Sequence, residues 1–201
     1  ARRQASLDAL ASQLPDVPGW TNLEKALADS TAEAWVVACT TAAHVPVVRR
    51  LLEAGKTVLL EKPITAALDE ADELISIAEE RRLVLQVGHI ERFNPALMAV
   101  KERLQSPRYI QAERSAPFTI RCTDVNVVLD LMIHDLDIVC DLAGAPPAQI
   151  SACGVSIITK EIDLATARIA FRNGCVADIT ASRISDEKKR ILRVFDGDTL
   201  Y

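Results

Sequence analysis

The chain has 201 residues, of which 49% are hydrophobic and 25% charged, and its formal net charge is -5. This composition is typical of a globular protein with a packed core, and the length allows one large domain or two small ones. The apolar runs are too short to span a bilayer, no secretion signal is visible, and a mixed acidic charge is atypical of a nucleic-acid surface. We therefore expect a cytoplasmic protein that binds neither membrane nor nucleic acid. Its five scattered cysteines predict reduced thiols.

The first half of the chain alternates helical and strand patterns. Helices are expected over residues 2–14, 21–28, 45–54 and 68–80, and strands over residues 34–39, 57–60 and 83–87. Unbroken apolar strands are typical of a parallel sheet that helices cover on both faces. Strands separated by helices of this length predict βαβ units in a doubly wound, Rossmann-type sheet.

The second half has a different pattern, with several strands connected by short turns. Strands are expected over residues 148–159, 163–172, 175–185 and 190–195, and helices over about 95–104 and 127–142. Asn173-Gly174 lies between two strand-like runs and is a hairpin signal. The fold class is therefore α/β: a Rossmann-type half, residues 1–90, joined near residues 88–94 to an antiparallel α+β half, residues 91–201.

Glu61, Lys62 and Pro63 directly follow the second expected strand. Ligands of open α/β sheets bind beyond the carboxyl ends of the strands. Pro63 pushes Lys62 towards an extended backbone, which aims a charged donor reproducibly into that crevice. A solvated turn is the alternative, and these residues alone leave both interpretations open.

Asp130, His134 and Asp137 are spaced by four and three residues on the expected helix 127–142, so they share one face. The rest of this helix is apolar, which predicts burial, and an unpaired buried polar group costs several kcal/mol, on the order of 2–7. These three residues form a polar stripe on the helix. The stripe would be explained if His134 were a general base supported by Asp130. A structural helix with bonded polar groups and a divalent metal site remain alternatives. Asp135 falls off this face and is expected to be a cap or salt-bridge partner.

Polar residues also follow the other two expected strands. Thr40 and Thr41 come after the first strand, where they would line a cofactor groove, and His44 is expected to start the next helix. His89 and Arg92 follow the third strand and would reach the same crevice.

The motifs Thr-Thr-x-x-His, Glu-Lys-Pro, Gly-His-x-x-Arg-Phe-Asn-Pro and Asp-x-x-x-His, in this order, resemble the Gfo/Idh/MocA oxidoreductase family over nearly the whole chain. The resemblance implies a Rossmann domain followed by an α+β domain with a mostly antiparallel, open-faced sheet. Because that sheet often mediates dimerisation in the family, it also implies a homodimer or homotetramer. The implied reaction transfers hydride between NAD or NADP and a sugar or related compound.

Carried over by position, the resemblance assigns roles to Lys62, Asp130, His134, Thr40 and Glu61, the other site residues follow from their positions after the strands, and we expect no metal ligand. Lys62, Asp130 and His134 would be catalytic: His134 removes the hydroxyl proton, Asp130 supports it, and Lys62 steadies the developing charge. His89 and Arg92, together with Lys62, would bind the substrate. The cofactor-binding residues would be Thr40, Thr41, His44, Glu61, Lys62 and Pro63, and the Lys62–Pro63 bond is often cis in relatives.

The sequences of residues 88–95, 112–118 and 180–183 are similar to those of one branch of the family, the predicted UDP-N-acetylglucosamine 3-dehydrogenases. This resemblance implies oxidation of the sugar's 3-hydroxyl. The sequence departs from the family in having no G-x-G-x-x-G motif, so we expect a parent protein that is longer at both ends. A non-catalytic, dimerising module with a vestigial nucleotide fold is the alternative.

Overall fold

The structure, a computed structural model, describes residues 3–119 and 125–201. The chain divides into two compact units, unit 1 (Ala1–Gly88) and unit 2 (His89–Tyr201), a boundary that lies within the join expected from the sequence. Cys122 lies outside the described residues. Among the described residues, no helix is both long enough and apolar enough to cross a membrane.

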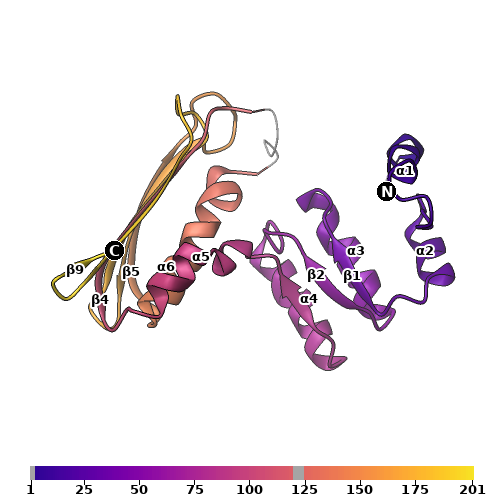
Figure 1. The fold of residues 1–201 in the computed structure, drawn as a ribbon, viewed down its shortest axis with the longest axis horizontal. Helices are drawn as coiled ribbons and strands as arrows, with labels where there is room; N and C mark the ends of the chain where they lie inside the picture. Colours follow the sequence, from indigo (N-terminus) through magenta and orange to yellow (C-terminus); the bar gives the residue numbers. More distant parts are fainter. Residues whose placement is uncertain (1–2, 120–124) are drawn as a thin grey trace. The chain divides into compact units, whose positions relative to one another are not determined.

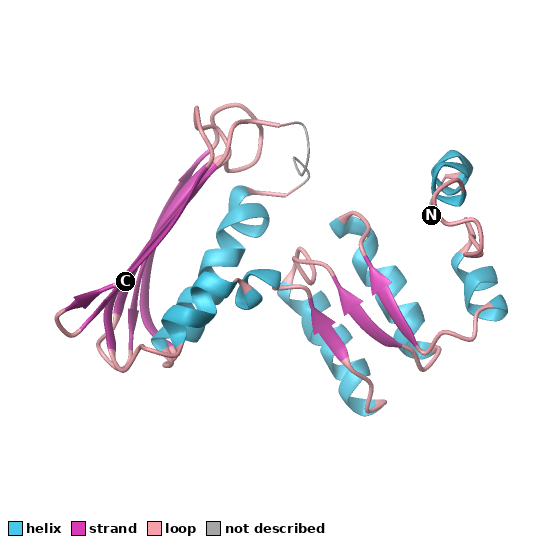
Figure 2. Cartoon of the chain, viewed as in Figure 1, coloured by secondary structure: helices cyan, strands magenta, loops and turns pink. Residues whose placement is uncertain are grey.

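Unit 1 is built on a parallel sheet with the strand order β1–β2–β3 (Figures 1 and 2). Its elements are α1 (Gln4–Ala11), α2 (Leu23–Asp29), β1 (Ala34–Val37), η1 (Thr41–Ala43), α3 (His44–Glu53), β2 (Thr57–Leu60), α4 (Leu68–Glu80) and β3 (Leu85–Val87). The strands pair in parallel and are separated by helices α3 and α4. The βαβ organisation predicted from the sequence is confirmed.

The sheet of unit 1 buries one face only. On that face, Val37, Val58 and Leu60 of the strands form one hydrophobic core with residues of helices α3 and α4. On the opposite face Val36 is 71% exposed and Leu59 is 42% exposed. The expectation that helices cover these strands on both faces is therefore wrong for the described residues, because both crossover helices pack on the same side.

Local capping signals explain where two helices begin. Asn22 caps α2, and its side chain accepts a hydrogen bond from the Lys25 backbone N–H at 3.0 Å. In unit 2, Asn94 likewise caps α5 (Pro95–Lys101) with Pro95 at the first helical position.

Unit 2 is a six-stranded sheet in the order β5–β6–β7–β4–β8–β9. Its elements are η2 (Ile90–Phe93), α5, β4 (Pro107–Ser115), η3 (Val128–Met132), α6 (Ile133–Ala143), β5 (Pro147–Val155), β6 (Leu164–Phe171), β7 (Val176–Ser182), β8 (Lys189–Asp196) and β9 (Thr199–Leu200). Only the β4–β7 pair is parallel among these strands, so the prediction of a mostly antiparallel sheet is confirmed. The Asn173-Gly174 hairpin is confirmed as well: it joins antiparallel β6 and β7, with Gly174 at φ 87°.

Helix α6 lies along one face of this sheet (Figure 2). Val139 of α6 packs in one core with Ile110 of β4 and Ile179 of β7, all fully or almost fully buried. The opposite face presents polar side chains, among them Arg168 and Asp178. Unit 2 therefore has one covered face and one open face among its described residues.

The expected helix over residues 127–142 begins differently from a regular α-helix. Val128–Met132 forms a π-helical turn, and the α-helix proper starts at Ile133. The wider π turn changes the angular spacing of side chains. The α-helical spacing that predicted a shared face for Asp130, His134 and Asp137 therefore does not apply at Asp130.

Candidate functional site

The carboxyl ends of β1 and β2 in unit 1 are joined through a buried histidine. His44 starts α3, as expected, and is 1% exposed. Its Nδ1 lies 2.9 Å from the carbonyl oxygen of Pro63, and its Nε2 lies 3.3 Å from the carbonyl oxygen of Cys39. Thr40 is exposed and its carbonyl accepts the Ala43 N–H at 2.8 Å. His44 thus ties the two strand-end loops together from within the core.

The Glu61-Lys62-Pro63 segment lies at the end of β2, as the sequence predicts. Glu61 donates its backbone N–H to the Val37 carbonyl at 2.9 Å, Pro63 is buried, and the Lys62–Pro63 peptide bond is cis. Lys62 is partly buried. The backbone of this segment is therefore fixed on two sides, by the sheet and by His44.

Gly88 brings the end of β3 against Glu61. Its N–H donates to the Leu60 carbonyl at 2.7 Å. A Cβ at position 88 would lie 3.3 Å from Glu61 Oε2 and 3.4 Å from the Leu60 carbonyl oxygen. The three strand ends thus form a narrow edge, with exposed Thr40 and Glu61, where a side chain at Gly88 would crowd its neighbours. This arrangement fits a ligand that approaches the backbone at the carboxyl edge of a parallel sheet.

In unit 2, Asp130 lies on the π-helical turn η3 and His134 on the first turn of α6. Both side chains are partly buried. Single π turns inside helices are frequent at functional sites, because they displace side chains from regular helical positions. The structure therefore places Asp130 on an irregular turn and His134 at the start of the regular α-helix that follows it.

Asp137, the third residue of the expected stripe, has a different partner. Arg92 binds it through two hydrogen bonds, from Nε at 2.7 Å and from Nη2 at 2.6 Å. His89 Nδ1 lies 3.9 Å from the same carboxylate. The hydrogen bond to Asp137 raises the pKa of Arg92 further above its ordinary value, against a smaller effect of burial. Across residues 3–119 and 125–201, no group of three potential metal ligands is found, so the metal alternative gains no support.

Asp135, the residue after His134, forms a buried ion pair with Arg114. The sequence predicted a partner for Asp135 but not which residue it is. Asp135, expected to be a cap or salt-bridge partner, accepts hydrogen bonds from Arg114 Nε and Nη2, both at 2.9 Å. Arg114 Nη1 also donates to Glu91 at 3.2 Å. Burial opposes the charge of Arg114, but the hydrogen bonds and the nearby carboxylates of Asp135 and Glu91 outweigh it and raise the pKa of Arg114. Arg114 was not among the predicted site residues, although an arginine at a core-facing position of an alternating strand was a usable signal.

A Rossmann-type unit with a lysine at a strand's carboxyl end, followed by a helix-backed open sheet, is the arrangement that the sequence predicted for a nucleotide-binding oxidoreductase. Comparison with known families agrees. Residues 1–89 match the model of the oxidoreductase family with an NAD-binding Rossmann fold, and residues 103–198 match the GFO/IDH/MocA C-terminal domain. The chain belongs to the GFO/IDH/MocA oxidoreductase family.

Individual relatives agree with this assignment. The chain is 45% identical over 159 residues to a UDP-N-acetylglucosamine 3-dehydrogenase of Acidithiobacillus ferrooxidans, covering 79% of the chain and 51% of that relative. The solved structure of UDP-N-acetylglucosamine 3-dehydrogenase GnnA from the same organism matches with a TM-score of 0.91 and 38% identity, over 98% of this chain and 65% of that one. GenD2 from gentamicin A biosynthesis, solved in complex with NAD, shares the fold (TM-score 0.90, 22% identity, 99% and 62% coverage). The chain spans about half the length of the curated relatives it matches.

Proposed function

We propose that the protein is an NAD(P)-dependent dehydrogenase that oxidises a sugar hydroxyl, with the 3-hydroxyl of UDP-N-acetylglucosamine as its substrate group. The observation that carries this proposal is the 45% identity to a relative with that name. It is supported by the residues at the strand ends of unit 1 and on η3 and α6 of unit 2, which are of the types that hydride transfer from an alcohol needs. The proposed location is the cytoplasm.

Unit 1 would hold the nicotinamide cofactor, which supplies the hydride acceptor when bound. The strand-end edge supports this role, because Gly88 leaves room beside Glu61 for a close approach. Lys62 would donate hydrogen bonds to the ribose and to the substrate oxygen, steadying negative charge on that oxygen. The remaining proposed cofactor-binding residues are Thr40, Thr41, His44, Glu61 and Pro63. Of these, His44 would act from the core, by holding the Pro63 carbonyl.

Unit 2 would provide the acid–base chemistry. His134 would remove the hydroxyl proton as the carbon loses hydride, because imidazole exchanges protons near neutral pH. Asp130 would orient His134 and support its positive charge. The helix that holds them is anchored in the core by Val127 and Val139, each 0% exposed, so the backbone beneath the proposed pair is fixed.

His89 and Arg92 are the proposed substrate-binding residues of unit 2. The bonds to Asp137 use the Nε and Nη2 groups of Arg92, and its side chain is 49% exposed. Because a guanidinium has five N–H groups in a planar fork, Nη1 can still donate to an anionic substrate. Asp137 would then orient Arg92 for that contact.

We also propose that the protein forms a homodimer or homotetramer through the sheet of unit 2. The open face of that sheet supports this. There Asp178 accepts hydrogen bonds from Arg168 on β6 and from Tyr109 on β4 at 2.6–2.7 Å. Tyr109 also contacts the ring of Phe195, with the centroids 5.6 Å apart. A face that carries hydrogen-bonded polar side chains and paired aromatic rings suits contact with a second copy.

The test is turnover of UDP-N-acetylglucosamine with NAD⁺ and, separately, NADP⁺, followed by nicotinamide absorbance. We expect Lys62→Ala and His134→Ala each to lower kcat by about 10²–10⁴-fold, the range for loss of an acid–base group. The matched control is Lys101→Ala, because Lys101 is an exposed lysine that pairs with Asp141. Near-normal kcat in His134→Ala or Lys62→Ala, with control-like folding, would refute the corresponding role.

A further inference from the structure

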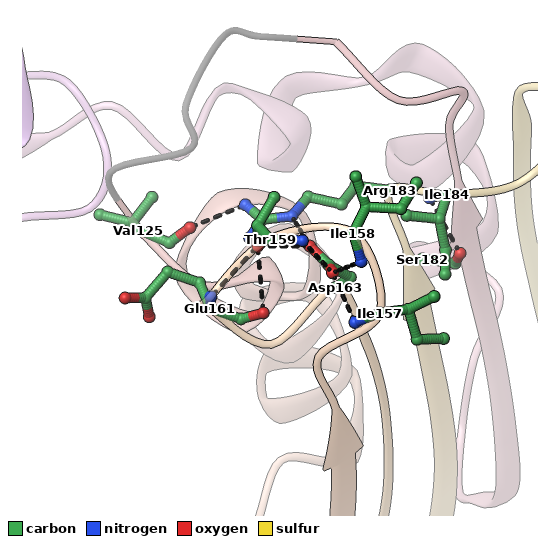
Figure 3. A network of polar contacts seen from close by, with 9 residues as sticks. All are labelled: Val125, Ile157, Ile158, Thr159, Glu161, Asp163, Ser182, Arg183 and Ile184. Carbon is green, nitrogen blue, oxygen red and sulfur yellow. Dashed lines mark hydrogen bonds and ion pairs between the residues drawn. The ribbon is translucent and has the colours of Figure 1, made fainter.

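A carboxylate with no exposed surface organises the loop between β5 and β6. Asp163 is 0% exposed, and Figure 3 shows its contacts. One of its oxygens, Oδ2, accepts the backbone N–H groups of Ile157, Ile158 and Thr159 at 2.7–2.9 Å. Its other oxygen accepts the Thr159 hydroxyl at 2.7 Å and Arg183 Nε at 2.9 Å. Five donors thus converge on a single buried group.

The ionised state of Asp163 is strongly favoured. Burial alone would raise the pKa of Asp163, but the hydrogen bonds from Thr159 and from the backbone N–H groups of Ile157 and Ile158 outweigh it. They hold that pKa well below its usual range. The loop therefore contains a fixed negative charge at any physiological pH.

Arg183 extends this network to a different part of the chain. It directly follows β7, and its side chain is 5% exposed. Besides binding Asp163, it donates from Nη2 to the Thr159 hydroxyl at 3.0 Å and from Nη1 to the Val125 carbonyl at 2.8 Å. Its planar fork thus connects the β5–β6 loop to the segment that leads into η3 (Figure 3).

The segment that Arg183 reaches is the entry of the helix carrying Asp130. Val127 is 0% exposed and donates its N–H to the Ile162 carbonyl at 2.9 Å, so the same loop holds it a second time. Asn126 accepts the backbone N–H of Asp130 on its carbonyl at 3.0 Å. Only four residues separate Val125, whose carbonyl Arg183 binds, from Asp130, and two of them, Val128 and Leu129, belong to the π turn.

We infer that Asp163 and Arg183 are positioning residues, which set the backbone of the π-helical turn and thereby the place of Asp130 and His134. This inference rests on the proposed function, in which those two residues act on the substrate. A π turn interrupts the regular i→i−4 hydrogen bonding of the helix, so its position depends more on contacts outside it. Arg183 supplies such an anchor, because it is itself held by a buried carboxylate that cannot move without losing its loop contacts.

The decisive variant is Arg183→Lys, which keeps the buried charge beside Asp163. An ammonium group lacks the planar fork, so it cannot reach Asp163, Thr159 and the Val125 carbonyl with the same geometry. We expect faster amide hydrogen exchange in residues 127–134. We also expect a fall in kcat of about 10- to 100-fold, as a displacement of about 1 Å produces, with little change in KM for NAD⁺ or NADP⁺.

Two further variants make the test independent of folding defects. Thr159→Val removes one hydroxyl of the network at constant shape and charge, and it should shift exchange and kcat in the same direction by a smaller factor. Asp141→Asn is the matched control, because it breaks an ion pair at the other end of α6. It should leave both measurements unchanged.

Wild-type exchange rates in residues 127–134 of both Arg183→Lys and Thr159→Val would overturn the inference. So would a fall in kcat that Asp141→Asn reproduces, or normal kcat despite faster exchange. Failure of the proposed function gives a different result: normal turnover in His134→Ala. In that event the exchange rates still decide whether Arg183 fixes the segment.

Discussion

Replacing Arg114 by methionine should destabilise unit 2 more than any exposed charge substitution. The side chains of Arg114 and Asp135 are each 7% exposed, and two hydrogen bonds of 2.9 Å join them. Arg114→Met keeps much of the apolar volume but leaves the Asp135 carboxylate buried without its counterion. Breaking a buried ion pair in this way costs about 3–5 kcal/mol. We expect the free energy of unfolding to fall by that amount at neutral pH.

The control for this prediction is Lys101→Met. Lys101, the last residue of α5, pairs with Asp141, which lies on α6 as Asp135 does. The side chains of Lys101 and Asp141 are 53% and 24% exposed. Because solvent screens such a pair, its loss should cost about 0–1 kcal/mol. Both variants are compared by equilibrium urea unfolding, followed by far-UV circular dichroism. A double variant, Arg114→Met with Asp135→Leu, should recover most of the lost stability, since it removes the orphaned charge.

Equal losses in the free energy of unfolding for Arg114→Met and Lys101→Met would refute this prediction. It would also fail if the double variant were less stable than Arg114→Met alone. The first result would mean that burial does not set the strength of these pairs. The second would mean that the carboxylate of Asp135 is stabilised by groups other than Arg114.

Two further outcomes are expected. His44→Ala should lower the free energy of unfolding by about 1–3 kcal/mol, because the buried Pro63 carbonyl loses its partner at 2.9 Å; an unchanged urea midpoint would contradict this. Acid should destabilise unit 2 below about pH 4, the ordinary value for Asp. Folding lowers the pKa of Asp178 to about 2, mainly through its bond to Arg168, and lowers that of Asp163. The stability that these carboxylates contribute is present above pH 4 and lost as pH falls towards 2, so Asp178→Asn should flatten the measured dependence. An equally steep fall in the free energy of unfolding with pH for wild type and Asp178→Asn would contradict this prediction.

Periodic and punctuating residues made much of the fold predictable. The helix Leu68–Glu80 and the strand Thr57–Leu60 have the bounds expected from their patterns. The turn at Gly174 and the helix entry at Pro95 were likewise readable, because a positive φ and a fixed φ are properties of single residues. The central strand β4 was missed, because its Arg114 points into the core beside Asp135 and disrupts the apolar alternation.

The candidate site was predictable in its residue types but not in its contacts. The position of Lys62 after a strand and the order of the motifs were visible in the sequence, and family membership is now shown. The roles of Lys62, Asp130 and His134 stay predictions. The hydrogen bond between Arg92 and Asp137 joins residues 45 positions apart in the chain, and no local sequence pattern predicts such a contact.

By itself, the sequence determined the order of most elements and the change from parallel to antiparallel pairing, and it supplied the candidate residues for hydride-transfer chemistry. These follow from side-chain periodicity and from motifs that act locally. Tertiary structure alone decided which charges became buried pairs, since Asp163 and Arg183 meet only when β6 and β7 pair. It also decided that the helix of Asp130 starts with a π turn. The physical reason is that desolvation and long-range hydrogen bonds depend on neighbours distant in the chain, which a local pattern does not encode.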